Sequence, residues 1–161
     1  MIFSFAQDLT LPATNKFLLE QSQLVAGIGS WALDLVHKKV YWTAGLYALH
    51  GLSPDQYTPT PENVYEHYED LDAIKYFELY NKALETSDQP AFSFEATVKK
   101  ADKSKIRVRV FNRVLRMNDT ITHIYGTTQD ITQEVEREQA LRTAKDDAEM
   151  ANRIKSDFLA N

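Results

Sequence analysis

The side chains of this sequence best suited to acid–base chemistry or metal ligation are four histidines: His37, His50, His67 and His123. They are scattered along the chain, and none belongs to a spaced motif such as HExxH. His37 falls in a predicted turn and His50 at a helix end, where the helix dipole favours a cation. No GxGxxG, GxxxxGKS/T or GxSxG pattern occurs either. We therefore expect no metal site and no catalytic residue in this chain.

The absence of cysteine limits the cofactors that the chain could hold. It excludes disulfides, thiolate metal sites and cysteinyl-flavin chemistry. Haem would need an axial donor inside a pocket, for which only His67 or His123 could be considered, so haem is not expected. A non-covalent small molecule or flavin stays open, because four aromatic residues on predicted strands could line a planar site: Trp31, Trp42, Phe94 and Tyr125. Their simpler interpretation is core packing.

Ligand sites on a sheet that curls around helices are small apolar cavities between the two layers. The candidate ligand-binding positions are therefore predicted on strands or on the helix above them. Gly126 would let a ligand approach the last strand, and Thr128 would offer a hydroxyl from it. The alternative for Gly126 is a strand bend. The full candidate set is Trp31, Phe77, Phe94, Gly126 and Thr128.

The elements that must position these residues follow from periodicity. Apolar residues at helical spacing predict helices, and a period of two predicts strands. The helices are expected at 15–26, 44–50, 71–86 (capped by Asp70) and 133–161, and the strands at 30–36, 39–43, 91–98, 106–117 and 121–131. This order predicts an α+β fold, with a five-stranded antiparallel sheet and helices on one face.

Five segments, in this order, make residues 24–132 resemble a PAS domain of the subgroup common in bacterial sensor kinases. They are GIGSWALDL (27–35), YWTAGLYALHGLSPDQY (41–57), HYED (67–70), FSFEATV (92–98) and GTTQDIT (126–132). The chain departs from the family at 102–104, where Asp-Lys-Ser replaces the usual Asp-Gly turn. The resemblance implies a linker and amphipathic helix at 1–26, a PAS sensor domain at 27–132 and a signalling helix at 133–161.

The junction Asp130, Ile131 and Thr132 resembles the transmission motif that closes many PAS domains. Asp130 can pair with a basic side chain near the sheet end, and Thr132 can cap the outgoing helix. Both features would also suit an ordinary capped helix. The resemblance adds the expectation that strand movement passes through these residues to the helix.

The helix 133–161 carries an apolar seam at three-four spacing, which suits a parallel coiled coil. Its residues are Leu141, Ala144, Ala148, Ala151 and Phe158. Val135 lies six residues before Leu141, out of step, which resembles a register break. The alternative is a monomeric solvated helix. The segment ANRIKSDFLAN (151–161) resembles the start of the dimerisation helix of sensor histidine kinases, including hybrid ones, and this favours a homodimer.

These features predict the sensing and transmission region of a two-component sensor histidine kinase, whose absent parts would use ATP and a response regulator. The chain itself is not expected to be an enzyme. Its net charge of −5 argues against nucleic acid, and no apolar run reaches the length of a membrane span. We expect a cytoplasmic location, with any membrane anchor upstream. Two alternatives remain: a ligand-free dimerisation or docking module using Tyr65, Tyr68 and Tyr76, and the regulatory domain of a cyclic-dinucleotide enzyme.

Overall fold

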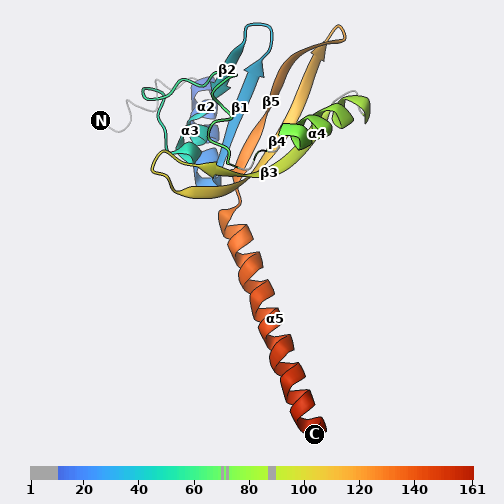
Figure 1. The fold of residues 1–161 in the computed structure, drawn as a ribbon. Coiled ribbons are helices and arrows are strands. Elements are labelled where there is room, and N and C mark those ends of the chain that lie inside the picture. The colour runs from blue at the N-terminus through green and yellow to red at the C-terminus, as the bar shows by residue number, and fades with distance from the viewer. Residues whose placement is uncertain (1–10, 70, 72, 87–89) are drawn as a thin grey trace, which may run out of the picture. The chain divides into compact units, whose positions relative to one another are not determined.

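The computed structural model describes residues 11–69, 71, 73–86 and 90–161, and Figure 1 shows its elements. The predicted cap Asp70 lies outside the described residues. The fold divides into two compact units, one ending at Asp130 and the other comprising Ile131–Asn161.

The first unit is built on one five-stranded antiparallel sheet, as predicted. Its strands lie in the order β2-β1-β5-β4-β3. Their bounds are β1 (Ile28–Asp34), β2 (Lys39–Trp42), β3 (Ala91–Lys99), β4 (Lys105–Met117) and β5 (Thr120–Asp130). All neighbouring strands pair antiparallel.

The first strand differs from its predicted range of 30–36, because it ends at Asp34. The carboxylate oxygen Oδ1 of Asp34 accepts hydrogen bonds from the backbone N–H groups of Val36 and His37, each at 2.9 Å. These bonds hold the chain in a turn two residues earlier than the apolar pair Leu35 and Val36 suggested.

The two faces of the sheet differ sharply in burial, which is clearest along β4. Val110 and Asn112 are 3% and 2% exposed, whereas Phe111 between them is 43% exposed. We call the buried side the inner face and the other side the outer face. The inner face carries the hydrophobic core, formed by Ala96, Val98, Val108 and Val110 with Trp31, Tyr68, Phe94 and Ile106 packed against them.

Helix α3 (Ala44–His50) lies against β1 at unusually short range. A Cβ atom added at Gly29 would overlap the backbone of Leu46, and one added at Gly45 would overlap the carbonyl oxygen of Ile28. Only glycine at both positions allows this approach. The contact places Leu46 above the inner face. Helix α2 (Leu11–Ala26) precedes β1 and contacts both α3 and β1.

The remaining inner-face layer consists of α4 (Ala73–Thr86) and the segment 52–69, which we call the cover segment. Tyr68 forms an isolated bridge with Val98. The carbonyl oxygen of His67 accepts a hydrogen bond from the N–H of Lys99 at 2.8 Å, and Glu69 donates its N–H to Thr97 O at 3.0 Å. These bonds hold the end of the cover segment on β3. Helix α4 contacts the same strand.

The second unit is a single helix, α5 (Thr132–Ala160). The prediction that Thr132 caps this helix was wrong: Ile131 is the N-cap residue, without a side-chain capping bond, and Thr132 is the first helical residue. The helical hydrogen bond from the Val135 N–H to Ile131 O explains the shift, since the helix closes one residue earlier than expected. No residue of α5 is buried, and Leu141 and Phe158 of the predicted seam are 73% and 80% exposed.

Candidate functional site

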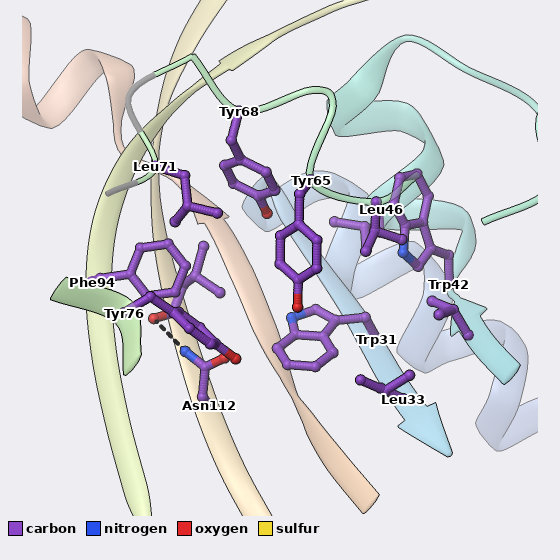
Figure 2. Close-up of a pocket in the computed structure, with 13 residues that line it drawn as sticks. Trp31, Leu33, Trp42, Leu46, Tyr65, Tyr68, Leu71, Tyr76, Phe94 and Asn112 are labelled. Atoms are coloured by element: carbon purple, nitrogen blue, oxygen red, sulfur yellow. Dashed lines mark hydrogen bonds between the residues drawn. The ribbon is translucent and has the colours of Figure 1, made fainter. Parts of the chain in front are cut away.

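A small cavity lies between the inner face of the sheet and the layer formed by α3, α4 and the cover segment (Figure 2). Its volume is about 60 Å³. Trp31 and Trp42 enter it as a cross-strand pair from β1 and β2. The lining residues are Trp31, Leu33, Val40, Trp42, Leu46, Val64, Tyr65, Tyr68, Leu71, Tyr76, Phe94, Val110 and Asn112. The apolar residues therefore surround a few polar groups that come from different elements.

Three tyrosines supply most of these polar groups. The hydroxyl groups of Tyr65 and Tyr76 lie close enough to influence each other's pKa. Burial raises the pKa of Tyr65 and Tyr76, and it raises the pKa of Tyr68 to about 12 against a smaller opposing effect of the Thr128 hydroxyl. All three phenols are therefore neutral at physiological pH.

Asn112 is the remaining polar side chain in the cavity wall. Its amide nitrogen donates to Phe92 O and Val110 O, both at the long distance of 3.4 Å. Asn112 and Tyr76 line the same cavity. Asn112 was not predicted, although its place in the alternation with Val110 and Val114 put it on the inner face.

An imidazole cluster, formed by His50, His67, Trp42 and Tyr57, adjoins the cavity and shares Trp42 with it. The Trp42 ring stacks on His50 with 4.6 Å between centroids, and the centroids of His50 and His67 are 5.2 Å apart. Tyr57 packs edge-on against His67. Among the described residues, the Nε2 atoms of both histidines lack a hydrogen-bond partner. The cluster is thus an aromatic contact with two unused nitrogen atoms.

The prediction of a cationic His50 at the helix end was wrong. His50 is 1% exposed, and burial lowers its pKa to about 4. Its Nδ1 lies 2.9 Å from Leu46 O, which can only accept, so Nδ1 carries the proton and Nε2 is an unprotonated acceptor. The neutral ring packs like an aromatic residue because the helix turns it inward with Leu46 and Leu49.

The predicted ligand positions divide into two groups. Trp31 and Phe94 line the cavity, and Thr128 is fully buried with its hydroxyl oxygen unpartnered among the described residues, although it is not part of the cavity wall. Phe77 does not belong there: it is 60% exposed, and its neighbour Tyr76 takes the inward position. Gly126 does not line the cavity either, since it belongs to an open groove with Tyr41, Phe111 and Tyr125.

Gly126 is needed for strand packing instead. A Cβ atom there would overlap the carbonyl oxygen of Phe111 on β4, so the close pairing of the strands requires glycine. The three tyrosines considered above as a docking surface, Tyr65, Tyr68 and Tyr76, all line the cavity, and Tyr65 is also 44% exposed, as that interpretation expected. Sequence alone could not separate these two uses of an aromatic side chain.

The junction residues are placed as follows. Asp130 ends β5, and its backbone N–H donates to Gly27 O at 2.8 Å, which anchors the end of this strand beside the start of β1. Ile131 is 1% exposed. Only this residue separates β5 from α5. The predicted role of the junction in transmission stays a prediction.

On the outer face, the carboxylate of Asp34 lies near two histidines. Its Oδ2 lies 2.8 Å from His37 Nδ1 and 3.6 Å from His123 Nε2. The part of the chain that the structure describes contains no group of three or more His, Asp or Glu side chains arranged to hold a metal ion. Within the same residues, no helix combines the length and apolar character that crossing a bilayer requires.

Comparison with solved structures identifies the fold. A sensory box histidine kinase/response regulator from Burkholderia thailandensis matches 84% of this chain and 98% of its own, with a TM-score of 0.62 and 18% identity. A PAS domain from Colwellia psychrerythraea matches 73% of this chain and 98% of its own, with a TM-score of 0.52 and 17% identity. The chain has the PAS fold.

A third solved PAS domain belongs to a protein with a different output. It is the N-terminal domain of a diguanylate cyclase with a PAS/PAC sensor from Marinobacter aquaeolei, which matches 66% of this chain and 97% of its own, with a TM-score of 0.51 and 14% identity. Neither a protein-family model nor a curated protein matches the chain. The PAS fold is therefore what these comparisons establish.

Proposed function

We propose that this chain is the sensing and transmission region of a two-component sensor histidine kinase. The observation that carries the proposal is the cavity between the inner face and its cover, since apolar walls with a few polar groups from different elements are typical of small-molecule sites. The segment ANRIKSDFLAN supports a kinase as the parent protein, as does the fold similarity to the sensory box histidine kinase.

The proposed transmission route begins at β5. This strand pairs with both β1 and β4, two strands that contribute cavity residues. One residue after β5 ends, α5 begins, so a shift of β5 is passed on through a short covalent connection. In a homodimer joined by the seam from Leu141 to Phe158, such a shift would change the register or rotation of two paired helices. That change would set autophosphorylation in the kinase core, which uses ATP and passes phosphate to a response regulator.

A chimera tests this proposal. The chain would be fused after Asn161 to a histidine kinase core in helical register, and autophosphorylation would be measured for the wild type and for Asp130→Ala. We expect Asp130→Ala to remove the response to the signal while the circular dichroism spectrum and melting temperature of the isolated chain stay within error. Asp146→Asn, on the exposed part of α5, is the matched control and should respond like the wild type.

An unchanged response of Asp130→Ala would contradict the transmission route. Analytical ultracentrifugation of residues 1–161 provides a second test, in which a dimer is expected. A strictly monomeric chain, even at high concentration, would contradict the coiled-coil part of the proposal.

The second candidate is a PAS module that binds no small molecule and acts in docking. The observation that favours it is the open outer-face groove lined by Tyr41, Phe111 and Tyr125, which are 55%, 43% and 41% exposed. Regulation of a cyclic-dinucleotide enzyme is supported only by the diguanylate cyclase domain of the same fold. The docking function would be favoured if autophosphorylation of the chimera did not change with any cavity ligand but did change on substitution of Phe111.

A further inference from the structure

The described residues of the cavity wall carry no charge, and this limits what the cavity can bind. None of its described lining residues is Asp, Glu, Lys, Arg or His. Its polar groups are three neutral phenols, the Trp31 and Trp42 indoles and the Asn112 amide. An ion moved from water into such surroundings loses its hydration without gaining a counter-charge, which is strongly unfavourable.

The size of the cavity sets a second limit. Its volume of about 60 Å³ exceeds the ~10–15 Å³ that one water molecule needs. It is less than half of the ~150 Å³ of an apolar cavity that binds benzene, and far below the ~300 Å³ at which ordinary cofactor pockets begin. The cavity therefore fits a molecule of a few non-hydrogen atoms.

The polar groups set a third limit, on hydrogen bonding. Asn112 is 2% exposed, and only its amide nitrogen makes hydrogen bonds among the described residues. Its amide oxygen is thus able to accept a hydrogen bond from a ligand. The Tyr65 hydroxyl is neutral, because burial raises its pKa, and it therefore carries a proton that it can donate. In Figure 2 the Tyr65 hydroxyl points toward Trp31.

We propose that the cavity binds a small uncharged organic molecule with both a hydrogen-bond donor and an acceptor, such as a primary amide or a short-chain alcohol. The ligand donates to the amide oxygen of Asn112 and accepts from a tyrosine hydroxyl, while Trp31 and Phe94 contact its apolar part. This inference rests on the proposed sensory function and names the ligand class of the same site. It excludes organic acids, which share the size but not the charge.

The test compares acetamide with acetate, two molecules of nearly the same shape that differ in charge. Trp31 and Trp42 are the only tryptophans of the chain and both line the cavity, so intrinsic fluorescence reports binding without a label. Because both also border the outer-face groove, the comparison of Asn112→Leu with Arg113→Leu assigns the signal to one of the two. A ligand of about four non-hydrogen atoms reaches a Kd no tighter than roughly tens of micromolar, so titrations should extend to about 100 mM. We expect a saturable change with acetamide and at least a tenfold weaker response to acetate.

Asn112→Leu is the variant that tests the hydrogen bond, because leucine has a similar shape and no polar atom. We expect acetamide to bind at least tenfold more weakly to it, while Arg113→Leu on the outer face binds like the wild type. If Asn112→Leu does not fold, the comparison of acetamide with acetate on the wild-type chain still decides the charge preference. Equal binding of acetate and acetamide would overturn the proposal.

The outcomes also separate this inference from the proposed function. Absence of any saturable response to acetamide and propan-2-ol would overturn the ligand class. If the kinase chimera then still responds to another signal through Asp130, the sensory function stands alone. If acetamide binds with the expected preference but never alters the chimera, the ligand class stands and the proposed coupling fails.

Discussion

The two sides of the sheet favour opposite charge states of their ionisable groups. On the inner side, burial favours the neutral forms: the pKa of His50 falls to about 4 and that of Tyr68 rises to about 12. On the outer side, the backbone N–H and side chain of His37 hold the pKa of Asp34 down at about 2, which favours its charged form. One sheet thus separates two electrostatic environments.

This separation is made by neighbouring residues of the same strand. Leu33 lines the cavity, while Asp34 next to it makes the ionic turn. On β4, the buried Asn112 lies between the exposed Phe111 and Arg113. Neutral groups are therefore favoured on the inner side of this sheet and a charged carboxylate on the outer side. This separation of neutral and charged groups can be tested by substitutions on both sides of the sheet.

The largest effect is expected where the inner layer is tightest. Gly29→Val would place side-chain atoms in the Leu46 backbone and push α3 off β1. We expect a loss of about 3 kcal/mol or more in the free energy of unfolding, measured by urea denaturation. The adjacent Ser30→Ala is the control and should cost at most about 1 kcal/mol, because it removes one hydrogen bond from Gln23. Equal losses in both variants would contradict the close packing.

The next effect is a loss of stability in acid through His50. Its pKa in the folded chain is about 4, below its ordinary value of 6.5. Between these values the unfolded chain binds a proton that the folded chain does not, so the free energy of unfolding falls as the pH falls. The full loss is about 3 kcal/mol, at about 1.4 kcal/mol per pKa unit. Urea titrations at pH 7 and pH 4.5 measure it.

His50→Phe should remove much of this acid sensitivity while keeping the aromatic packing on Trp42. His67 faces His50, and burial lowers the pKa of His67 too, against a smaller opposing effect of Glu66. A smaller dependence of the free energy of unfolding on pH should therefore remain in this variant. Tyr68 also faces the ring but stays neutral throughout. The control His37→Gln changes an exposed histidine of the outer side. It should keep the pH dependence of the free energy of unfolding that His50 causes. An undiminished slope in His50→Phe would contradict the assignment.

A smaller effect on stability is expected from Asp34, where folding favours the charged form of the side chain and not the neutral form. Because its pKa is lowered in the folded chain, its contribution to stability is present above its ordinary pKa of 3.8 and is lost as the pH falls to about 2. Asp34→Asn should therefore melt at a lower temperature than the wild type at pH 6, and the two melting curves should converge near pH 2. A constant difference across this range would show that the charge of Asp34 is not what matters.

The smallest effect is expected on the exposed part of the outer face. Phe111→Ser should change the free energy of unfolding by no more than about 0.5 kcal/mol, because this ring is 43% exposed. Phe94→Ser on the inner face should cost about 3 kcal/mol or more. Thermal melts at equal protein concentration compare the two. A large loss for Phe111→Ser would show that the outer face is covered in solution.

Most of the fold was predictable because strands of period two show their buried face directly. The same pattern contained Asn112, which shares the phase of Val110 and Val114. An amide side chain in a strand gives no sign of its own that it is buried, so only the alternation with these two valines marks Asn112 as an inner-face residue.

The helical part of the site was less predictable. Two overlapping stripes run along α4, and both include Tyr80: one contains Phe77 and Leu84, the other Tyr76 and Ala83. Periodicity favoured the first, whereas the structure turns Tyr76 and Ala83 inward and leaves Phe77 exposed. Helix rotation depends on the fit between Tyr76 and the rings of Phe92 and Phe94, which are far away in sequence.

Trp42 belongs to the cavity wall and also stacks on His50. A ligand that moves this ring therefore alters the surroundings of an imidazole 4.6 Å away, and with them the free energy of adding a proton. Thermodynamic reciprocity then requires protonation of His50 to change ligand affinity by the same factor. The shared indole would make the cavity a site whose occupancy in acid differs from that at neutral pH, even though none of the described lining residues is charged.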